Sequence, residues 1–275
     1  MIVDCHCHAG PGDGLSGPWD SDARLDAYLR EADAAGIERT VVFPVFHSDY
    51  LLANRAVAAI VRRRPERLVG FAFVHPVRDR GRVGDLVGEA VTRHGFRGIK
   101  VHRNDARISA EICEVARALG VPILYDVMGE VAQVELLARQ YPEVPFIIPH
   151  LGSFVDDWRA QLALIDHLVR HPNVFADTSG VRRFDLLREA VRRAGPGKIL
   201  FGSDGPWLNP ALELYKVELL RLRPTDFARV AGGNALRLLS EQERRRRARG
   251  RTQVHVGGQP AQDPWRAEQE APAIP

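Results

Sequence analysis

The sequence predicts a (β/α)8 barrel, the TIM-barrel architecture of the α/β class. Segments of strand length, rich in β-branched and apolar residues, alternate with segments of helical periodicity, and this pairing occurs eight times within residues 1–240. The strand segments are apolar on both faces, as in a parallel sheet that is covered by helices. Eight such units in about 250 residues are typical of a barrel. An open, doubly wound sheet is the alternative, but it rarely contains eight evenly spaced units.

Eight strands are expected, each bounded by turn residues. The second is representative, because residues 40–46 read T-V-V-F-P-V-F, a run suited to burial on both faces of a sheet. The expected strands cover residues 2–8, 40–46, 68–74, 96–101, 121–127, 144–149, 173–178 and 198–202.

Helices are expected between the strands, where apolar residues recur with helical spacing. Gly36 ends the first helix, Pro65 halts the second and Gly120 ends the fourth. A loop rich in Gly and Pro, residues 10–19, precedes the first helix. The expected helices cover residues 22–35, 48–64, 82–94, 109–119, 130–141, 156–171, 184–194 and 210–222, and a further helix covers residues 225–240.

Composition and charge narrow the class of protein. The 275 residues are 45% hydrophobic, and 38 Lys and Arg against 35 Asp and Glu give a net charge of +3, which excludes a basic nucleic-acid-binding body. No basic and apolar leader and no long apolar run are present, so we expect no membrane partner. Three cysteines without a leader favour a reducing, cytoplasmic environment. The expected partner is a small-molecule substrate, and a homodimer is compatible with the sequence.

The chain divides at about residue 240. Residues 1–240 form the expected barrel domain, whereas residues 241–275 begin with an arginine-rich run and continue with Gly, Gln, Pro and Ala. This segment lacks the apolar periodicity needed to bury a face, so we expect a disordered tail. A solvated tail is the favoured interpretation, and contact of its arginines with RNA or a membrane is the alternative.

The first strand carries an H-x-H pair. Because side chains alternate along a strand, His6 and His8 share one face and Cys5 and Cys7 are expected to face the helices as small apolar residues. The two histidine Cα atoms lie about 6.6 Å apart on a strand, which lets both imidazoles reach one metal ion. Two solvent-facing histidines are the alternative.

Reactive side chains gather at the expected strand ends, where active sites of such barrels lie. Any single histidine could be a packing residue, but six at one rim favour a metal or a polar ligand. The histidines are His6, His8, His47, His75, His102 and His150; Lys100, Tyr125, Asp126, Asp177 and Asp204 end other strands. We expect substrate to be bound by Lys100, His102, Arg103, His47 and His75. Loop arginines at the rim favour an anionic substrate, although solvated arginines are the simpler explanation.

Asp204 and His150 are the candidate catalytic residues. Asp204 follows Gly202, which permits close backbone approach, and precedes Gly205-Pro206, which turns the chain outward. Its carboxylate can complete a metal site with the H-x-H pair and also accept a proton. A turn-forming aspartate is the alternative. His150, in P-H-L-G, suits a general base, an oxyanion partner or a second metal ligand.

Several motifs together resemble the amidohydrolase-related family, which contains aminocarboxymuconate-semialdehyde decarboxylase. The motifs are D-C-H-C-H-A-G, G-I-K-V-H, I-I-P-H-L-G, N-V-F-A-D-T-S, F-G-S-D-G-P-W and G-G-N-A-L-R-L-L. The resemblance implies a metal-dependent barrel in which His6, His8 and Asp204 match metal ligands. It also implies that His150 orients or deprotonates the nucleophilic water. Members hydrolyse amides, esters or lactones, or remove carboxylate groups without oxidation.

The chain departs from this family at the fifth strand. The family usually has a metal-binding histidine there, whereas this sequence reads P-I-L-Y-D-V-M-G and places Asp126 at that position. We therefore expect Asp126 as a metal ligand, and the alternative is that it only orients substrate or a neighbouring histidine. Its carboxylate makes Mn2+ or Mg2+ more plausible than in the family pattern, although Zn2+ remains the favoured divalent ion. In some branches of the superfamily a fourth-strand lysine is carboxylated and bridges two metals, so Lys100 has either that role or substrate binding.

The leading functional hypothesis is hydrolysis of a small amide, ester or lactone by metal-activated water, with Asp204 or His150 transferring protons. Non-oxidative decarboxylation of a small carboxylate at the same metal site is the alternative. A third hypothesis is a barrel that has lost its chemistry and only binds a ligand.

Overall fold

The computed structural model describes residues 1–15, 22–154 and 156–240. The expected disordered tail, residues 241–275, lies outside these residues. Within the described ranges, none of the helices is both long enough and apolar enough to cross a membrane.

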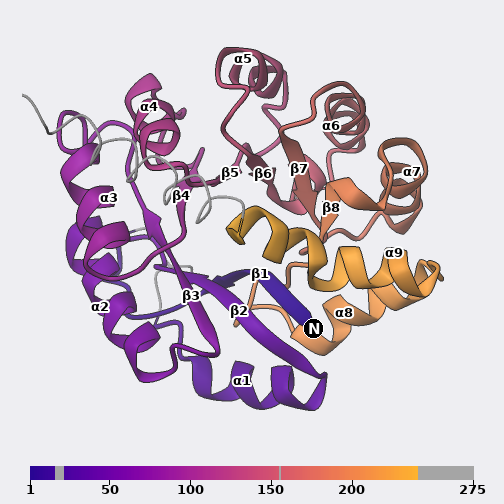
Figure 1. Cartoon of the computed structure of the whole chain (residues 1–275), viewed down its shortest axis with the longest axis horizontal. Coiled ribbons are helices and arrows are strands. Elements are labelled where there is room, and N and C mark those ends of the chain that lie inside the picture. Colours follow the sequence, from indigo (N-terminus) through magenta and orange to yellow (C-terminus); the bar gives the residue numbers. More distant parts are fainter. Residues whose placement is uncertain (16–21, 155, 241–275) are drawn as a thin grey trace, which may run out of the picture.

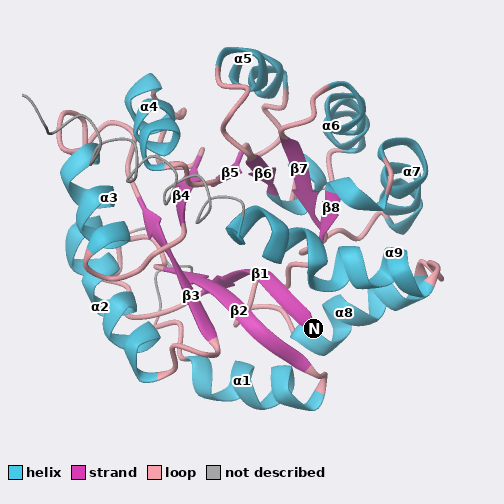
Figure 2. Ribbon diagram, viewed as in Figure 1, coloured by secondary structure: helices cyan, strands magenta, loops and turns pink. Residues whose placement is uncertain are grey.

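Eight parallel strands form one sheet in the order β1-β2-β3-β4-β5-β6-β7-β8 and are ringed by helices (Figures 1 and 2). Backbone hydrogen bonds join the last strand region to the first: Cys5 N donates to Phe201 O at 3.0 Å, and Asp204 N donates to His6 O at 2.8 Å. The sheet therefore closes on itself, and the predicted (β/α)8 barrel is confirmed.

The observed elements follow the expected order. The strands are β1 Ile2–His8, β2 Ile37–Phe43, β3 Leu68–Phe73, β4 Gly98–His102, β5 Ile123–Asp126, β6 Phe146–Ile148, β7 Val174–Asp177 and β8 Ile199–Leu200. The helices are α1 Leu25–Ala34, α2 Tyr50–Arg63, α3 Val83–Thr92, α4 Ala110–Leu119, α5 Ala132–Gln140, α6 Trp158–Arg170, α7 Phe184–Ala194, α8 Pro210–Leu219 and α9 Pro224–Ala228. β2 lies earlier than expected and ends before Pro44, which has no N–H to donate to a neighbouring strand.

A β-bulge in β1 changes which side chains face the barrel interior. Asp4 pairs with Thr40 and Cys7 with Val42, so three steps along β1 oppose two along β2. The extra residue places Cys5 in the interior apolar cluster, whereas Cys7 belongs to the cluster shared with the helices. The prediction that Cys5 faces the helices is therefore wrong, and the prediction for Cys7 is confirmed.

The barrel interior is filled by apolar side chains from every strand except β4, among them Phe43, Phe71 and Leu200. β4 instead directs Lys100 inward, with its Nζ 4.9 Å from the centre of the Phe43 ring. A polar group is thus placed on the floor of the barrel mouth, directly above the apolar interior cluster.

The end of the described chain closes the amino-terminal side of the barrel. A π-helical turn, η4 Arg229–Gly233, follows α9, and the chain is helical again over residues 234–240. Leu238 packs into the interior cluster, and this yellow segment lies across the ring in Figure 1. The single helix expected over residues 225–240 is therefore interrupted. At the interruption a Cβ on Gly232 would lie 2.5 Å from the carbonyl oxygen of Met1, so only glycine fits there.

Candidate active site

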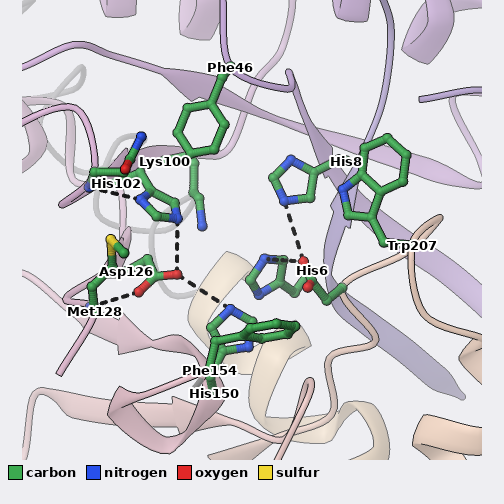
Figure 3. Close-up of a pocket in the computed structure, with 12 residues that line it drawn as sticks. His6, His8, Phe46, Lys100, His102, Asp126, Met128, His150, Phe154 and Trp207 are labelled. Carbon is green, nitrogen blue, oxygen red and sulfur yellow. Dashed lines mark hydrogen bonds and ion pairs between the residues drawn. The ribbon is translucent and has the colours of Figure 1, made fainter. Parts of the chain in front are cut away.

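A cavity of about 440 Å3 opens at the carboxyl ends of the strands (Figure 3). The polar side chains that line it come from β1, β4 and β5 and from the segments that follow β4, β6 and β8. The polar residues are His6, His8, Lys100, His102, Asn104, Asp126, His150 and Asp204, and the apolar residues are Phe46, Met128, Phe154 and Trp207. The cavity therefore combines a polar floor with apolar, mostly aromatic walls.

His6, His8 and Asp204, called the trio below, converge at one side of the cavity. Asp204 Oδ1 lies 3.2 Å from His6 Nε2 and 3.4 Å from His8 Nε2. The donor atoms of the trio all lie within 4.8 Å of one another. Two ligands bound tetrahedrally to one zinc ion lie about 3.3–3.4 Å apart, because each bond is about 2.0–2.1 Å long. The trio therefore has the spacing of a metal site.

The hydrogen bonds behind the two histidines fix their tautomers. His6 Nδ1 donates to Asp177 Oδ2 at 2.8 Å, and His8 Nδ1 donates to the carbonyl oxygen of Pro44 at 3.2 Å. In neutral rings these bonds leave both Nε2 lone pairs facing the carboxylate of Asp204. Within the described part of the chain, His6 Nε2 is buried without a hydrogen-bond partner, and burial lowers the pKa of His8 to about 4. With both rings in these neutral tautomers, two imidazole nitrogens and a carboxylate face one another, an arrangement that fits a divalent cation.

The backbone holds Asp204 against β1. Its φ is +59°, a left-handed conformation that non-glycine residues seldom adopt, and its N–H is held by the carbonyl of His6. A Cβ on Gly202 would lie 3.0 Å from the Cβ of His6 and 3.1 Å from the Cγ of Asp177. The predicted role of Gly202 in close approach is thus confirmed, and a strained turn aims the carboxylate at the trio.

Asp126 lies in a different group of side chains from the trio. Its Oδ2 is 3.1 Å from His102 Nε2 and 3.4 Å from His150 Nε2, and Oδ1 accepts the N–H of Met128 at 2.9 Å. We call Asp126, His102 and His150 the Asp126 cluster. Among the described residues, the donor group containing the trio does not include Asp126. Its assignment as a metal ligand stays a prediction, and the contacts point instead to a role with the two imidazoles.

His150 is held by its backbone and by Ser179. The residue has a φ of +57°, and its Nδ1 donates to the carbonyl oxygen of Ser179 at 2.9 Å. Since Nδ1 carries a proton, Nε2 makes a favourable contact with the Asp126 carboxylate only as a second donor. Burial lowers the pKa of His150, but the hydrogen bond and charge of Asp126 outweigh it and raise that pKa to about 9. Both ring nitrogens of His150 are then hydrogen-bond donors, and the ring lines the cavity.

Three of the predicted substrate-binding residues are not among the residues that line the cavity. His47 Nδ1 accepts the N–H of Asp49 at 2.9 Å, and His75 Nδ1 accepts two loop N–H groups, both at 3.1 Å. Arg103 pairs with Glu130 at 2.7 Å. Each of these side chains contacts neighbouring loop residues, so its position does not support the predicted role in substrate binding. Lys100 and His102 do line the cavity.

Sequence analysis missed two kinds of site residue. Asp177 and Ser179 orient His6 and His150 from behind; both lie in the motif N-V-F-A-D-T-S, but no role was predicted for either. The apolar walls were also missed. Trp207 follows the S-D-G-P turn and Phe154 follows P-H-L-G-S, so proximity to the polar motifs could have identified both.

A second group of potential metal donors lies on the helical layer. Glu135 belongs to α5, and His167 and His171 lie at the end of α6. The guanidinium of Arg170 contacts His167 Nδ1 at 3.3 Å and Glu135 Oε2 at 3.9 Å. Because a protein cation already serves these donors, we assign no ion there.

Comparisons with known proteins agree with this geometry. A model of the amidohydrolase family matches residues 3–240. A 2,6-dihydroxybenzoate decarboxylase from Rhizobium is similar in structure, with a TM-score of 0.67 and 19% identity over 87% of this chain and 98% of the other. A search of curated proteins found no match.

Two further solved structures illustrate the range of relatives. A dihydroxybenzoic acid decarboxylase from Polaromonas, with bound manganese and the inhibitor 2-nitroresorcinol, has a TM-score of 0.65 and 19% identity, covering 87% of this chain and 96% of the other. A probable 2-pyrone-4,6-dicarboxylic acid hydrolase from Acinetobacter baumannii, with citric acid bound, has a TM-score of 0.67 and 15% identity, covering 87% and 99%. At such identities the likeness shows the fold.

Proposed function

Because the chain belongs to the amidohydrolase family, we propose that it is a metal-dependent enzyme that removes a carboxylate group from a small aromatic acid without oxidation. In this reaction the bond between the ring carbon and the carboxylate breaks, carbon dioxide leaves, and the ring carbon keeps the electron pair and takes up one proton. The reaction needs an anion-binding centre, a proton donor and walls that hold a flat ring.

The observation that carries the proposal is the protonation of His150, whose two ring nitrogens both act as hydrogen-bond donors. Its Nδ1 proton is committed to the Ser179 carbonyl, and its Nε2 faces both the cavity and Asp126. The ring of His150 lies 5.1 Å from that of His6, measured between centroids, so the donor stands beside the trio. A histidine held in this state is suited to give a proton to carbon rather than to take one from water.

The trio would hold the metal, with Zn2+ as the expected ion and Mn2+ as the alternative. The ion, when bound, supplies positive charge that draws in and neutralises an anionic substrate. Three protein ligands leave room for substrate, as in catalytic rather than structural sites. Asp177 keeps His6 in the tautomer that serves this role.

The walls of the cavity favour an aromatic substrate. Phe46, Phe154 and Trp207 line it together with Met128, and flat apolar surfaces exclude water from the reacting carboxylate. The Rhizobium and Polaromonas structures carry the names of decarboxylases of dihydroxybenzoic acids, which is consistent with this substrate class.

Hydrolysis is the second candidate, and a specific observation favours it. The carboxylate of Asp204 is buried, lines the cavity and lies against the Nε2 atoms of His6 and His8. An ionised carboxylate at the trio can accept a proton from water during attack on an ester or lactone. The Acinetobacter structure carries the name of a probable hydrolase, which is consistent with this second candidate.

Isotope incorporation separates the two reactions. The purified chain, loaded with Zn2+ or Mn2+, is incubated with aromatic carboxylates, lactones and amides. In D2O, decarboxylation places deuterium on the carbon that lost the carboxylate and releases carbon dioxide, whereas hydrolysis in 18O-water places the label in the new carboxyl group. Hydrolysis products without carbon dioxide release would contradict our proposal. Full metal occupancy without any turnover would indicate a barrel that only binds ligands.

The role of His150 is tested by His150→Gln. We expect turnover to fall by about 100- to 10,000-fold, the usual contribution of a general acid, while metal content stays the same. His167→Gln, on the helical layer, is the matched control and should leave turnover unchanged. Equal turnover in His150→Gln and the unmodified chain would remove His150 from the proton-transfer step.

A further inference from the structure

The buried ammonium group of Lys100 has no hydrogen-bond partner. The residue is 0% exposed, and its Nζ is a buried polar atom without a partner among the described residues. Figure 3 shows the side chain pointing into the cavity, between the trio and the Asp126 cluster. Burying an ammonium group without hydrogen bonds is unfavourable and lowers the pKa of Lys100, so an anionic partner in the cavity would stabilise its charged form.

The other two lysines of the chain have hydrogen-bond partners, so a lysine without one is an exception in this protein. The sequence contains only Lys100, Lys198 and Lys216. Lys198 Nζ donates to two backbone carbonyls, at 2.5 and 2.9 Å, and Lys216 Nζ lies 2.6 Å from Glu213 Oε2. Both have hydrogen-bond acceptors from the protein, whereas Lys100 Nζ lies over the Phe43 ring and has no acceptor among the described residues.

The nearby carboxylates do not serve as its partner either. Asp126, Asp177 and Asp204 are the acidic groups whose charge reaches Lys100. Each is already engaged: Asp126 with His102 and His150, Asp177 with His6, and Asp204 with the histidines of β1. Within residues 1–15, 22–154 and 156–240, no ion pair of 4.0 Å or less includes Lys100. A lysine that only balanced these charges would lie against one of them.

We propose that Lys100 binds a second anionic group of the substrate, so that the enzyme selects small aromatic compounds with two acidic groups. One carboxylate would lie at the trio, and the other carboxylate or a phenolate would accept hydrogen bonds from Lys100 Nζ. This inference rests on the proposed function, because it places the first carboxylate at the trio. A cavity of about 440 Å3 has room for one substituted ring.

Binding of inert probes tests the inference without turnover. Benzene-1,2-dicarboxylate, benzene-1,3-dicarboxylate and benzoate are titrated calorimetrically into the full, metal-loaded chain. We expect at least one dicarboxylate to bind about 10- to 100-fold more tightly than benzoate, the usual effect of a charged hydrogen bond. Lys100→Met should remove that preference, Lys100→Arg should keep part of it, and Lys198→Arg should leave it unchanged.

A second measurement uses the unmodified sequence and so does not depend on how Lys100→Met folds. Lysine labelled with 13C at Cε gives three resonances, and Lys198→Arg and Lys216→Arg identify two of them. We expect the remaining resonance, from Lys100, to shift with the dicarboxylate and not with benzoate. Equal affinity for all three probes, or a Lys100 resonance that no probe moves, would overturn the inference.

The two proposals can fail separately. Dicarboxylate preference that depends on Lys100, in a chain that turns over no substrate, would support the inference and contradict the proposed reaction. Decarboxylation of monocarboxylates that is unaffected in Lys100→Met would support the proposed reaction and contradict the inference about Lys100.

Discussion

At the scale of single residues, the site works through pairs in which one side chain fixes the protonation of another. His102 Nδ1 accepts the N–H of Asn104 at 3.0 Å, so its proton is on Nε2 and points to Asp126. Asp126 then faces two imidazole donors, and the charges and hydrogen bonds of these histidines outweigh burial and hold its pKa well below the usual range. These contacts and the N–H of Met128 engage three of the roughly four lone-pair sites of the carboxylate.

These contacts predict the effect of the substitution Asp126→Asn. The substitution keeps the shape and removes the charge that favours a protonated His150, so we expect turnover to fall while metal content and affinity stay the same. Metal titration with parallel turnover measurements checks both. A 10- to 100-fold loss of metal affinity, roughly what removal of a ligand or its close partner costs, would instead make Asp126 a ligand, as the family pattern suggested.

Asp177→Asn, unlike Asp126→Asn, is expected to weaken metal binding. Asp177 accepts the Nδ1 proton of His6 and so maintains a metal-binding lone pair on Nε2. An amide at this position holds the ring less firmly, and we expect about 10- to 100-fold weaker metal binding. Asp226→Asn is the control and should bind metal normally, because Asp226 is a buried aspartate of α9 that pairs with Arg223 and Arg229. Unchanged affinity in Asp177→Asn would show that the tautomer does not depend on this carboxylate.

The residue scale also shows what sequence reasoning could reach. Alternation along a strand predicted that His6 and His8 face one way, and a strand end followed by glycine predicted where Asp204 lies. That the partner of Asp126 is His102 in particular was out of reach, because it depends on the register that places these two residues opposite each other in β4 and β5. Periodicity within one strand carries no information about such a register.

At the scale of elements, the bulged strand β1 depends on a buried carboxylate behind it. Asp4 accepts the N–H groups of His6 and Ser203, at 3.0 and 2.9 Å, and the hydroxyl of Tyr28 at 2.6 Å. These bonds tie the bulge to helix α1 and to the segment that carries Asp204. Burial raises the pKa of Asp4 to about 6, so each donor is needed to keep the ionised form in place.

Tyr28→Phe removes one of these donors without changing the packing of the ring. We expect the free energy of unfolding to fall by about 1–3 kcal/mol, the cost of leaving a buried acceptor less satisfied. Urea denaturation measures the change. Tyr215→Phe, at a position that is 53% exposed, is the matched control and should be neutral. A neutral Tyr28→Phe would mean that the remaining donors suffice.

Element boundaries were predictable where a local signal existed. α7 has the limits expected from its periodicity, whereas the expected last helix is broken by the turn Arg229–Gly233. That break arises from contact between Gly232 and the first strand, two segments at opposite ends of the barrel sequence. The bulge in β1 has the same kind of cause, since its register is set by β2 and by the donors around Asp4.

At the scale of the whole molecule, the trio lies on the seam that closes the barrel. His6 and His8 come from β1, and Asp204 follows β8, so a bound ion would join the first strand of the ring to the last. The seam itself is joined by few backbone bonds, with an isolated bridge between Cys7 and Gly205 in place of a long ladder. The metal is therefore expected to stabilise the fold as well as to bind substrate.

Chelation tests this coupling. An ion that binds only the folded chain, at 100 times its dissociation constant, adds about 2.7 kcal/mol to the free energy of unfolding. We expect EDTA to lower the thermal midpoint and Zn2+ or Mn2+ to restore it, with about one ion bound per chain. The double variant His6→Ala, His8→Ala should bind no ion at this site and should have a midpoint that neither treatment moves. A variant with His167→Ala and His171→Ala, the histidines outside the barrel, should respond like the unmodified chain. If removing the barrel histidines left metal content and the response to EDTA intact, the ion would bind elsewhere and the trio would not close the seam.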